Sequence, residues 1–283
     1  MVEADQTPEK RTLLITGCST GIGRCVAEGM RERGWRVFAT ARKSADVAAL
    51  HQAGFESCRI DLADSASIQE GLHWVLEQTG GGLDALFNNG AYGQPGALED
   101  LTREALREQF ETNLFGTHEL TRLVLPVMRQ QGAGRIVQNS SILGFVGLPF
   151  RGAYVASKFA LAGLTESMRL EMRGSGIDFI LIEPGPIESD FRKNARQAFL
   201  KHINAQKSIY QQKYQGWSKQ VEEGVSERFT LPPQAVLDKV ILALESRRPK
   251  LRYGVTTPTH VFWVLRCLLP RRWVDFLLSR AGR

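Results

Sequence analysis

Short apolar runs alternate along most of the chain with stretches of helical periodicity. The apolar runs predict strands at residues 12–16, 36–40, 55–60, 85–88, 135–139 and 178–183, with a final short strand near 251–253. The periodic stretches predict helices at about residues 21–33, 44–53, 65–79, 102–130 and 153–173. Strands that are apolar throughout are buried on both faces. The pattern therefore predicts an α/β fold, a doubly wound parallel sheet of about seven strands with helices on both faces.

The alternation covers residues 11–255, which we interpret as one domain. Residues 1–10 are polar and are expected to be a flexible N-terminus. They have no apolar core of a secretory signal. Residues 186–230 interrupt the rhythm and contain several large apolar side chains: Phe191, Phe199, Ile209, Tyr210, Tyr214 and Trp217. These side chains either line an apolar pocket or pack the insert on the sheet.

The positive charge of the chain is concentrated at its C-terminal end. The net charge is +6, but residues 247–283 contain nine Lys and Arg and one acid, so this segment carries +8 and the remainder −2. A nucleic-acid-binding face on the main domain is therefore not expected. The extension 256–283 predicts two short amphipathic helices hinged at Pro270. It suits packing over the substrate mouth or onto a partner subunit, and as an alternative peripheral membrane contact through Trp263, Trp273 and their neighbouring arginines.

The cysteines and histidines give no sign of a disulfide framework or a metal site. The four cysteines are scattered, which favours a reducing cytoplasm. The five histidines fit no zinc spacing, so no catalytic metal is expected.

Two motifs indicate chemistry. After the first strand the chain continues Thr16-Gly17-Cys18-Ser19-Thr20-Gly21-Ile22-Gly23, a glycine-rich turn into a helix. Such glycines let the backbone approach a pyrophosphate and let the helix N-terminus donate to it. Further on, Tyr154 and Lys158 stand four apart, on one helix face. A nearby ammonium is expected to lower the tyrosine pKa and so prepare it for proton transfer.

Together these motifs resemble the short-chain dehydrogenase/reductase family, in its single-domain branch. The resemblance extends over roughly residues 10–255. It is carried by the glycine turn, by Asn113, by Ser141 thirteen residues before Tyr154, by Lys158, and by Pro184-Gly185-Pro186-Ile187. One departure is Asn88-Asn89-Gly90-Ala91, where the family usually has Asn-Asn-Ala-Gly. Both exchanged residues are small, so a cofactor should still fit, but the local turn geometry is left open.

The resemblance implies a role for each matching residue. Tyr154 is the acid or base, Ser141 holds the substrate oxygen, with Ser140 as its rival, and Lys158 also binds the nicotinamide ribose. Asn113 would anchor a water that relays protons to Lys158. Asp61 would lie near the adenine, although helix capping is a second interpretation. The expected cofactor contacts are Gly17, Ser19, Thr20, Gly21, Ile22, Gly23, Arg42, Asp61, Leu62, Asn88, Tyr154, Lys158, Pro184, Gly185, Ile187 and Ser189. Residues 186–230 would form a substrate lid.

The end of the second predicted strand indicates the cofactor. An acidic residue there would bind the adenosine ribose hydroxyls and repel a 2′-phosphate, and none is present. Arg42, with Lys43 beside it, offers a cation instead. NADP(H) is therefore favoured over NAD(H), unless this loop is simply solvated.

The sequence thus predicts an NADP-dependent oxidoreductase that interconverts a carbonyl and an alcohol. Its pattern is closest to the hydroxysteroid and retinol dehydrogenase-like group and to bacterial aldehyde reductases, which implies a lipophilic small-molecule substrate. A homodimer or homotetramer is expected. The alternatives are a 3-oxoacyl thioester reductase and a cofactor-binding sensor without turnover.

Overall fold

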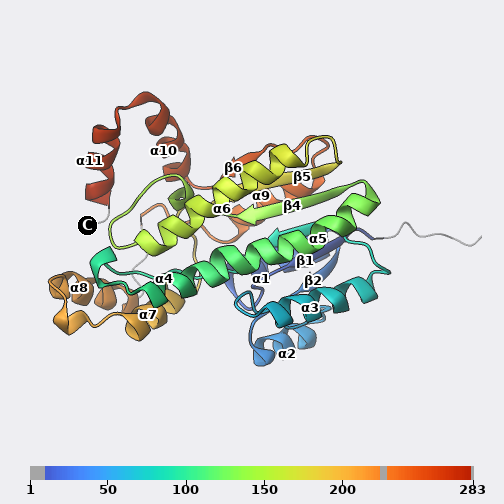
Figure 1. Cartoon of the computed structure of the whole chain (residues 1–283), viewed down its shortest axis with the longest axis horizontal. Helices are drawn as coiled ribbons and strands as arrows, with labels where there is room; N and C mark the ends of the chain where they lie inside the picture. Colours follow the sequence, from blue (N-terminus) through green and yellow to red (C-terminus); the bar gives the residue numbers. More distant parts are fainter. Residues whose placement is uncertain (1–9, 224–227, 282–283) are drawn as a thin grey trace, which may run out of the picture.

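The sheet contains six parallel strands. The computed structural model describes residues 10–223 and 228–281, so the expected flexible N-terminus lies outside the described residues except for Lys10. The strands are β1 (Thr12–Ile15), β2 (Arg36–Ala39), β3 (Ala85–Asn88), β4 (Gly134–Asn139), β5 (Ile177–Glu183) and β6 (Arg252–Gly254). Their spatial order is β2-β1-β3-β4-β5-β6 (Figure 1). The winding reverses between β1 and β3, and ligands bind outside the carboxyl ends of strands at such a point.

Helices cover both faces of this sheet, as the sequence predicts, because alternate strand residues point to opposite sides. Leu13 and Ile15 pack with α1 (Gly21–Glu32), α2 (Ser44–Gln52) and α9 (Gln234–Glu245). Leu14, between them, packs on the other face with α3 (Ser65–Gln78), α5 (Thr117–Gln131) and α6 (Gly152–Glu171). Two apolar layers therefore sandwich the sheet, which is the Rossmann-like doubly wound arrangement.

The predicted strand at residues 55–60 is wrong. This segment makes two isolated bridges to the edge of the sheet, Phe38 with Glu56 and Ala41 with Arg59. The bridges rest on two bonds, from the Ala39 N–H to the Glu56 oxygen and from the Ile60 N–H to the Ala41 oxygen. Too few bonds join the segment to β2 for a continuous ladder, so the sheet has six strands and not about seven.

The predicted helix at residues 102–130 is divided. It consists of α4 (Arg103–Phe110), a π-helical turn η2 (Glu111–Gly116) and α5. A methyl group on Gly116 would lie 1.7 Å from the Leu62 carbonyl oxygen, so only glycine fits at this close approach. Wide turns of this kind are frequent at functional sites, and Asn113 lies in this one.

The insert forms α7 (Phe191–His202) and α8 (Gln211–Glu222), joined by η4 (Ala205–Lys207). Phe199 and Tyr214 are almost fully buried in a cluster with residues of α4 and with Ala97 and Leu101, which flank η1 (Leu98–Asp100). The Tyr214 hydroxyl accepts from the Ala97 N–H at 2.8 Å. Of the two sequence interpretations, packing therefore accounts for these two aromatic residues.

The C-terminal extension forms α10 (Thr257–Leu268) and α11 (Arg271–Ala281), which meet at Leu269 and Pro270 as predicted. The pair projects from the sheet beside the N-terminal end of α6 (Figure 1). Within residues 10–223 and 228–281, no helix has the length and apolarity needed to cross a bilayer.

Candidate active site

The turn between β1 and α1 is built by close backbone contacts. Gly17 has a φ of +72°, in the left-handed region that favours glycine. A methyl group on Gly23 would lie 2.2 Å from the Gly17 oxygen. The Asn89 side chain donates to the main-chain oxygens of Thr16 at 3.0 Å and Gly17 at 3.2 Å. Any side chain at Gly23 would therefore push the turn out of shape.

The N-terminal end of α1 is open to an anion. Its cap residue Thr20 makes no side-chain cap bond, and the first turn carries no acid. Ser19 and Thr20 are exposed, and Ile22 is half-buried. The free N–H groups and the helix dipole at such an end favour a phosphate. The open end and the glycine packing beneath it fit the pyrophosphate of a dinucleotide.

Tyr154, Lys158 and Ser141 come together at the carboxyl ends of β4 and β5. The Lys158 ammonium donates to the main-chain oxygen of Asn139 at 2.7 Å and lies 5.7 Å from the centre of the Tyr154 ring. The Ser141 hydroxyl forms a hydrogen bond with the Tyr154 phenol. The predicted Ser-Tyr-Lys set therefore has a geometry suited to proton transfer.

The predicted direction of the tyrosine pKa is wrong. Burial raises the pKa of Tyr154 to about 12, and the hydrogen bond with Ser141 acts in the opposite direction. Lys158 does not supply the expected stabilisation of the phenolate, because burial lowers its own pKa to about 7. An ammonium that is itself poorly solvated loses its proton more readily and is a weaker neighbouring charge.

Ser141 rather than Ser140 faces the tyrosine. The Ser141 Oγ accepts from the Leu143 N–H at 3.1 Å and lies 3.4 Å from the Pro184 oxygen, to which it donates. These two contacts fix it at the start of η3 (Ile142–Gly144). The Ser140 hydroxyl is buried without a hydrogen-bond partner in the described structure, against Gly144. The thirteen-residue spacing thus selected the serine that contacts Tyr154.

Asn113 connects the loop after β3 to α6, the helix that carries Tyr154. Its amide donates to the Tyr92 oxygen at 2.9 Å and to the Ser157 hydroxyl at 3.2 Å, and accepts from the Tyr92 N–H at 3.1 Å. The Ser157 hydroxyl in turn donates to the main-chain oxygen of Tyr154 at 2.8 Å. One amide proton therefore holds the loop at Tyr92 and the other braces α6 through Ser157. The water between Asn113 and Lys158 stays a prediction.

The segment after β5 closes over the turn. A methyl group on Gly185 would lie 2.2 Å from the Thr256 hydroxyl, and one on Gly21 would lie 2.9 Å from Ser189 Cβ. Ser189 therefore sits directly against the start of α1. Ile187 is held by a bridge to Leu231. This contact brings the predicted nicotinamide segment next to the predicted pyrophosphate turn.

The predicted ribose and adenine residues lie at the end of β2. The Arg42 side chain is exposed, and its main-chain oxygen accepts from Arg59 at 3.1 Å. Asp61 accepts from the Ala63 N–H at 3.1 Å. Asp64, not Asp61, caps α3 by accepting from the Ser67 N–H at 3.2 Å. The capping interpretation of Asp61 is therefore wrong, and its place near the adenine remains a prediction.

The sequence analysis predicted a cofactor contact for Asn88 and no role for Asn89. The Asn88 amide is buried and donates to Thr121 on α5 at 2.9 Å. Asn89 holds the glycine turn and also accepts from Asn139 at 2.9 Å, the residue whose oxygen binds Lys158. The pair of amides after an apolar strand was the available signal. The exchanged Gly90 keeps the turn intact, because its N–H donates to the Thr16 hydroxyl at 2.9 Å. The other exchanged residue, Ala91, is half-buried.

Phe191 covers Tyr154. Its ring meets the Tyr154 ring edge to face, with 5.4 Å between the ring centres. It also fills the space above Gly93, where a methyl group would lie 2.8 Å from the Phe191 ring. The first residue of α7 therefore limits the room beside the Tyr154 phenol.

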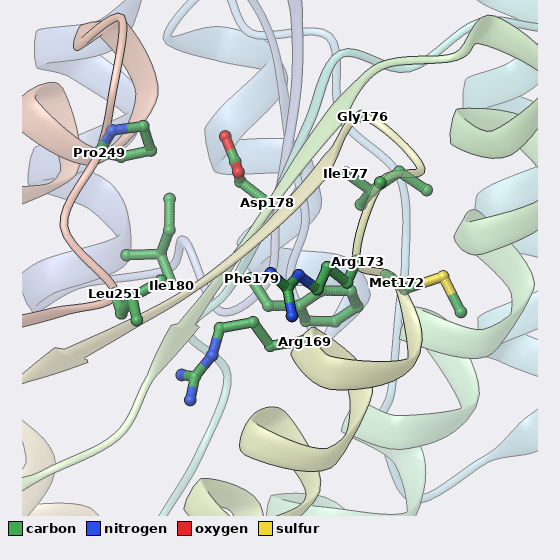
Figure 2. Close-up of a pocket in the computed structure, with 11 residues that line it drawn as sticks. Arg169, Met172, Arg173, Gly176, Ile177, Asp178, Phe179, Ile180, Pro249 and Leu251 are labelled. Carbon is green, nitrogen blue, oxygen red and sulfur yellow. The ribbon is translucent and has the colours of Figure 1, made fainter.

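A cavity of about 380 Å³ lies at the opposite end of the strands and is separate from this centre. Figure 2 shows it at the amino end of β5, with Arg169, Arg173 and Asp178 among its lining residues. Tyr154 lies near the start of α6, whereas Arg169 lies near its end. The cavity therefore takes no part in the arrangement around Tyr154. Among the described residues, no cluster of His, Cys, Asp and Glu is suited to a metal ion.

Comparisons with known proteins agree with this arrangement. Residues 11–199 match the short chain dehydrogenase family. The chain is 41% identical over 271 residues to the uncharacterized oxidoreductase YbbO of Escherichia coli (strain K12), covering 95% of this chain and 94% of the relative. It is 32% identical to the 17-beta-hydroxysteroid dehydrogenase type 1 of Homo sapiens, over 87% of this chain and 78% of the relative.

Solved structures share the fold. A short chain dehydrogenase/reductase from Burkholderia phymatum in complex with NAD superposes with a TM-score of 0.76 at 24% identity, over 95% of both chains. One from Burkholderia cenocepacia in complex with NADP gives 0.74 at 22%, over 95% of this chain and 98% of the other. The family match and the relatives of over 30% identity show that this chain is an oxidoreductase belonging to the short-chain dehydrogenase/reductase family.

Proposed function

We propose that the protein is an NADP(H)-dependent oxidoreductase that interconverts a carbonyl and an alcohol on a lipophilic substrate through Ser141, Tyr154 and Lys158. The observation that carries the proposal is the contact of the Ser141 hydroxyl with the Tyr154 phenol, beside a lysine held by the Asn139 oxygen. A hydroxyl pair backed by a buried amine is suited to moving one proton at one oxygen.

The raised pKa of Tyr154, about 12, keeps the phenol in the protonated form that reduction of a carbonyl requires. At neutral pH the phenol keeps its proton and can give it to the oxygen of a carbonyl that is being reduced. Ser141 donates a hydrogen bond to the same oxygen and stabilises the charge that develops there. Lys158, with a pKa of about 7, can then return a proton to Tyr154. The bound cofactor supplies the hydride for the carbonyl carbon.

Arg42 supports the preference for NADP(H). Its guanidinium is exposed at the end of β2, where no acidic residue follows the strand. It lies close enough to Tyr92 for its charge to oppose the burial that raises the Tyr92 pKa to about 12. A cation beside the crevice suits the additional phosphate of NADP(H), whereas a carboxylate would repel it.

The lipophilic substrate class rests on Phe191 and on the names of relatives. Phe191 presents an aromatic wall to Tyr154. Two relatives over 30% identical are named as a hydroxysteroid dehydrogenase and a retinol dehydrogenase. The alternative is a 3-oxoacyl thioester reductase, which would need exposed cations for an anionic carrier. Lys207 and Lys213 in residues 186–230 are such cations.

A homodimer or homotetramer in a reducing cytoplasm remains our expectation. Its support is a groove of about 550 Å³ on the outer side of η2, α5 and α6, lined by Leu114, Phe115, Ala160, Gly163 and Leu164 among others. Phe115 is half exposed there, as an anchor for a second copy would be.

A substrate and cofactor panel tests the proposal. The purified protein is mixed with NADPH or NADH and with aliphatic aldehydes, retinal, ketosteroids or oxoacyl thioesters, and oxidation of the cofactor is followed by absorbance. We expect NADPH oxidation with a lipophilic aldehyde or ketone. Turnover restricted to oxoacyl thioesters would favour the alternative, and binding of NADPH without turnover of any carbonyl would favour a sensor.

A further inference from the structure

The C-terminal helix pair has an inner face fixed to the protein next to the catalytic serine. Val274 and Leu278 of α11 are almost fully buried and pack with Phe145 and Val146, which follow η3. Arg266 of α10 donates to the Phe145 oxygen at 2.7 Å. The pair is therefore held against the turn that begins at Ser141, beside the proposed site.

The outer face of the same pair is apolar and exposed. On α10 the exposed residues are spaced three and four apart, and on α11 three and one apart, so each set shares one helix face. Their exposed fractions are Val261 45%, Val264 55% and Leu268 73%, then Trp273 63%, Phe276 46% and Leu277 38%. Exposed apolar patches on monomers usually mark an interaction site. The two sequence interpretations, packing and membrane contact, therefore apply to opposite faces of the same helices.

Cations surround this outer face. Arg271, Arg272 and Arg280 are exposed on α11, and Asp275 is the only acid in the helix. The Arg280 guanidinium lies over the Phe276 ring, 4.2 Å from its centre. None of the ion pairs found in residues 10–223 and 228–281 engages these three arginines. Long cationic side chains beside apolar and tryptophan side chains suit the boundary between lipid headgroups and acyl chains.

We propose that α10 and α11 form an interfacial membrane-binding surface that lies on an anionic lipid bilayer. Neither helix is long enough to span one, so the pair lies in the plane of the surface. A second copy of the chain is a poorer occupant, because a two-fold contact would set this strongly basic segment against itself. If the proposed function is correct, the contact brings the mouth beside Ser141 to the membrane that dissolves the substrate.

Vesicle flotation of the full-length chain tests the proposal without any turnover. Vesicles of phosphatidylcholine alone are compared with vesicles containing phosphatidylglycerol, at low and high salt. We expect the protein to bind the anionic vesicles at least about tenfold more tightly than the neutral ones. High salt should weaken the binding to the anionic vesicles. Failure of the proposed reaction would leave this result unchanged.

Two matched double variants identify the surface. Leu268→Glu with Phe276→Glu alters the outer face, and Leu170→Glu with Ile209→Glu makes the same charge change at residues 71% and 83% exposed elsewhere. All four sites are on the surface, and equal unfolding midpoints would verify that both variants fold. We expect the first variant to lose about tenfold or more in vesicle affinity and the second to lose far less. No binding by the wild type, or equal losses in both variants, would overturn the proposal. The proposal would also be overturned if the first variant had a lower molecular mass in solution than the wild type but the same vesicle affinity. That result would assign the surface to a second copy of the chain.

Discussion

The glycine turn before α1 and the helices α7 and α8, which we propose as the substrate lid, flank the same centre but are held in opposite ways. In the turn, backbone lies on backbone, and a methyl group on Gly23 would lie only 2.2 Å from the Gly17 oxygen. In the lid, aromatic rings pack on one another, and Gly216 of α8 has nothing within 4 Å of a built methyl group. The first region tolerates no change of shape, whereas the second can be repacked. We therefore expect cofactor binding to depend on the turn and substrate choice to depend on the lid.

Replacing Gly23 and Gly216 by alanine should give the largest difference between the two regions. Gly23→Ala forces the turn apart and is expected to lower the free energy of unfolding by at least about 2–3 kcal/mol and to abolish cofactor binding. Gly216→Ala should instead raise the free energy of unfolding by about 0.5–1 kcal/mol, because alanine is the better helix former. Urea unfolding and cofactor titration measure both effects. Equal and small effects of the two changes would remove the distinction between the regions.

Arg42 tests whether the cofactor half also selects the nucleotide. Arg42→Ala should weaken NADPH about ten- to a hundredfold, the value of a charge-assisted hydrogen bond, and leave NADH almost unchanged. Dissociation constants of both cofactors are measured by fluorescence titration. An exposed arginine at the opposite end of the sheet offers a matched control, Arg173→Ala, which should change neither dissociation constant. If NADPH and NADH weaken equally, Arg42 does not recognise the 2′-phosphate.

Phe191 tests whether the lid selects the substrate. Phe191→Ala opens the space beside the Tyr154 ring, so the ratio of kcat/KM for a bulky ketone over a small aldehyde should rise about tenfold, the usual scale for a change in an apolar pocket. Ile209→Ala, at a lid residue that is 83% exposed, is the control and should leave the ratio unchanged. A similar fall in kcat/KM for both substrates would mean that Phe191 only supports the fold.

Lys158 tests whether the catalytic centre is as tightly packed as the turn. Its pKa is about 7 in the folded protein and 10.5 ordinarily. Between these values the unfolded chain binds a proton that the folded chain does not, so raising the pH stabilises the fold. From pH 7 to 9 the cofactor-free wild type should gain up to about 1 kcal/mol per pH unit relative to Lys158→Met. If the difference in the free energy of unfolding between the wild type and Lys158→Met is the same at pH 7 and pH 9, the ammonium remains solvated.

The parts that could be predicted from sequence are those that depend on neighbours along the chain. Gly17, Gly21 and Gly23 must stand together for a close turn, and Tyr154 and Lys158 share a face because one helix carries both. The tyrosine pKa was predicted in the wrong direction, because burial depends on elements distant in sequence. The same holds for Asn89, whose partners Thr16 and Asn139 lie on two other segments, and for the π turn at Asn113, which follows from the approach of Leu62 to Gly116.

The structure of residues 55–60 could also not be predicted from the local sequence pattern. Their composition suits a strand, but a strand needs a partner in register. Residues 55–60 have two such bonds, from the Ala39 N–H in β2 to the Glu56 oxygen and from the Ile60 N–H to the oxygen of Ala41, which lies beyond the end of β2. In the C-terminal extension, the sequence indicated amphipathic helices correctly. It could not tell which face is covered, because Val274 and Leu278 meet Phe145 from a segment more than a hundred residues earlier.

The most direct test of the central claim is the hydride-transfer rate of Tyr154→Phe in a single turnover with NADPH and an accepted substrate. Phenylalanine keeps the ring packed against Phe191 but has no proton to give to the substrate oxygen. We predict a rate at least about a hundredfold lower than that of the wild type, the low end for general acid catalysis, with the NADPH dissociation constant and the unfolding midpoint unchanged. A rate close to that of the wild type would contradict the assignment of Tyr154 as the proton donor.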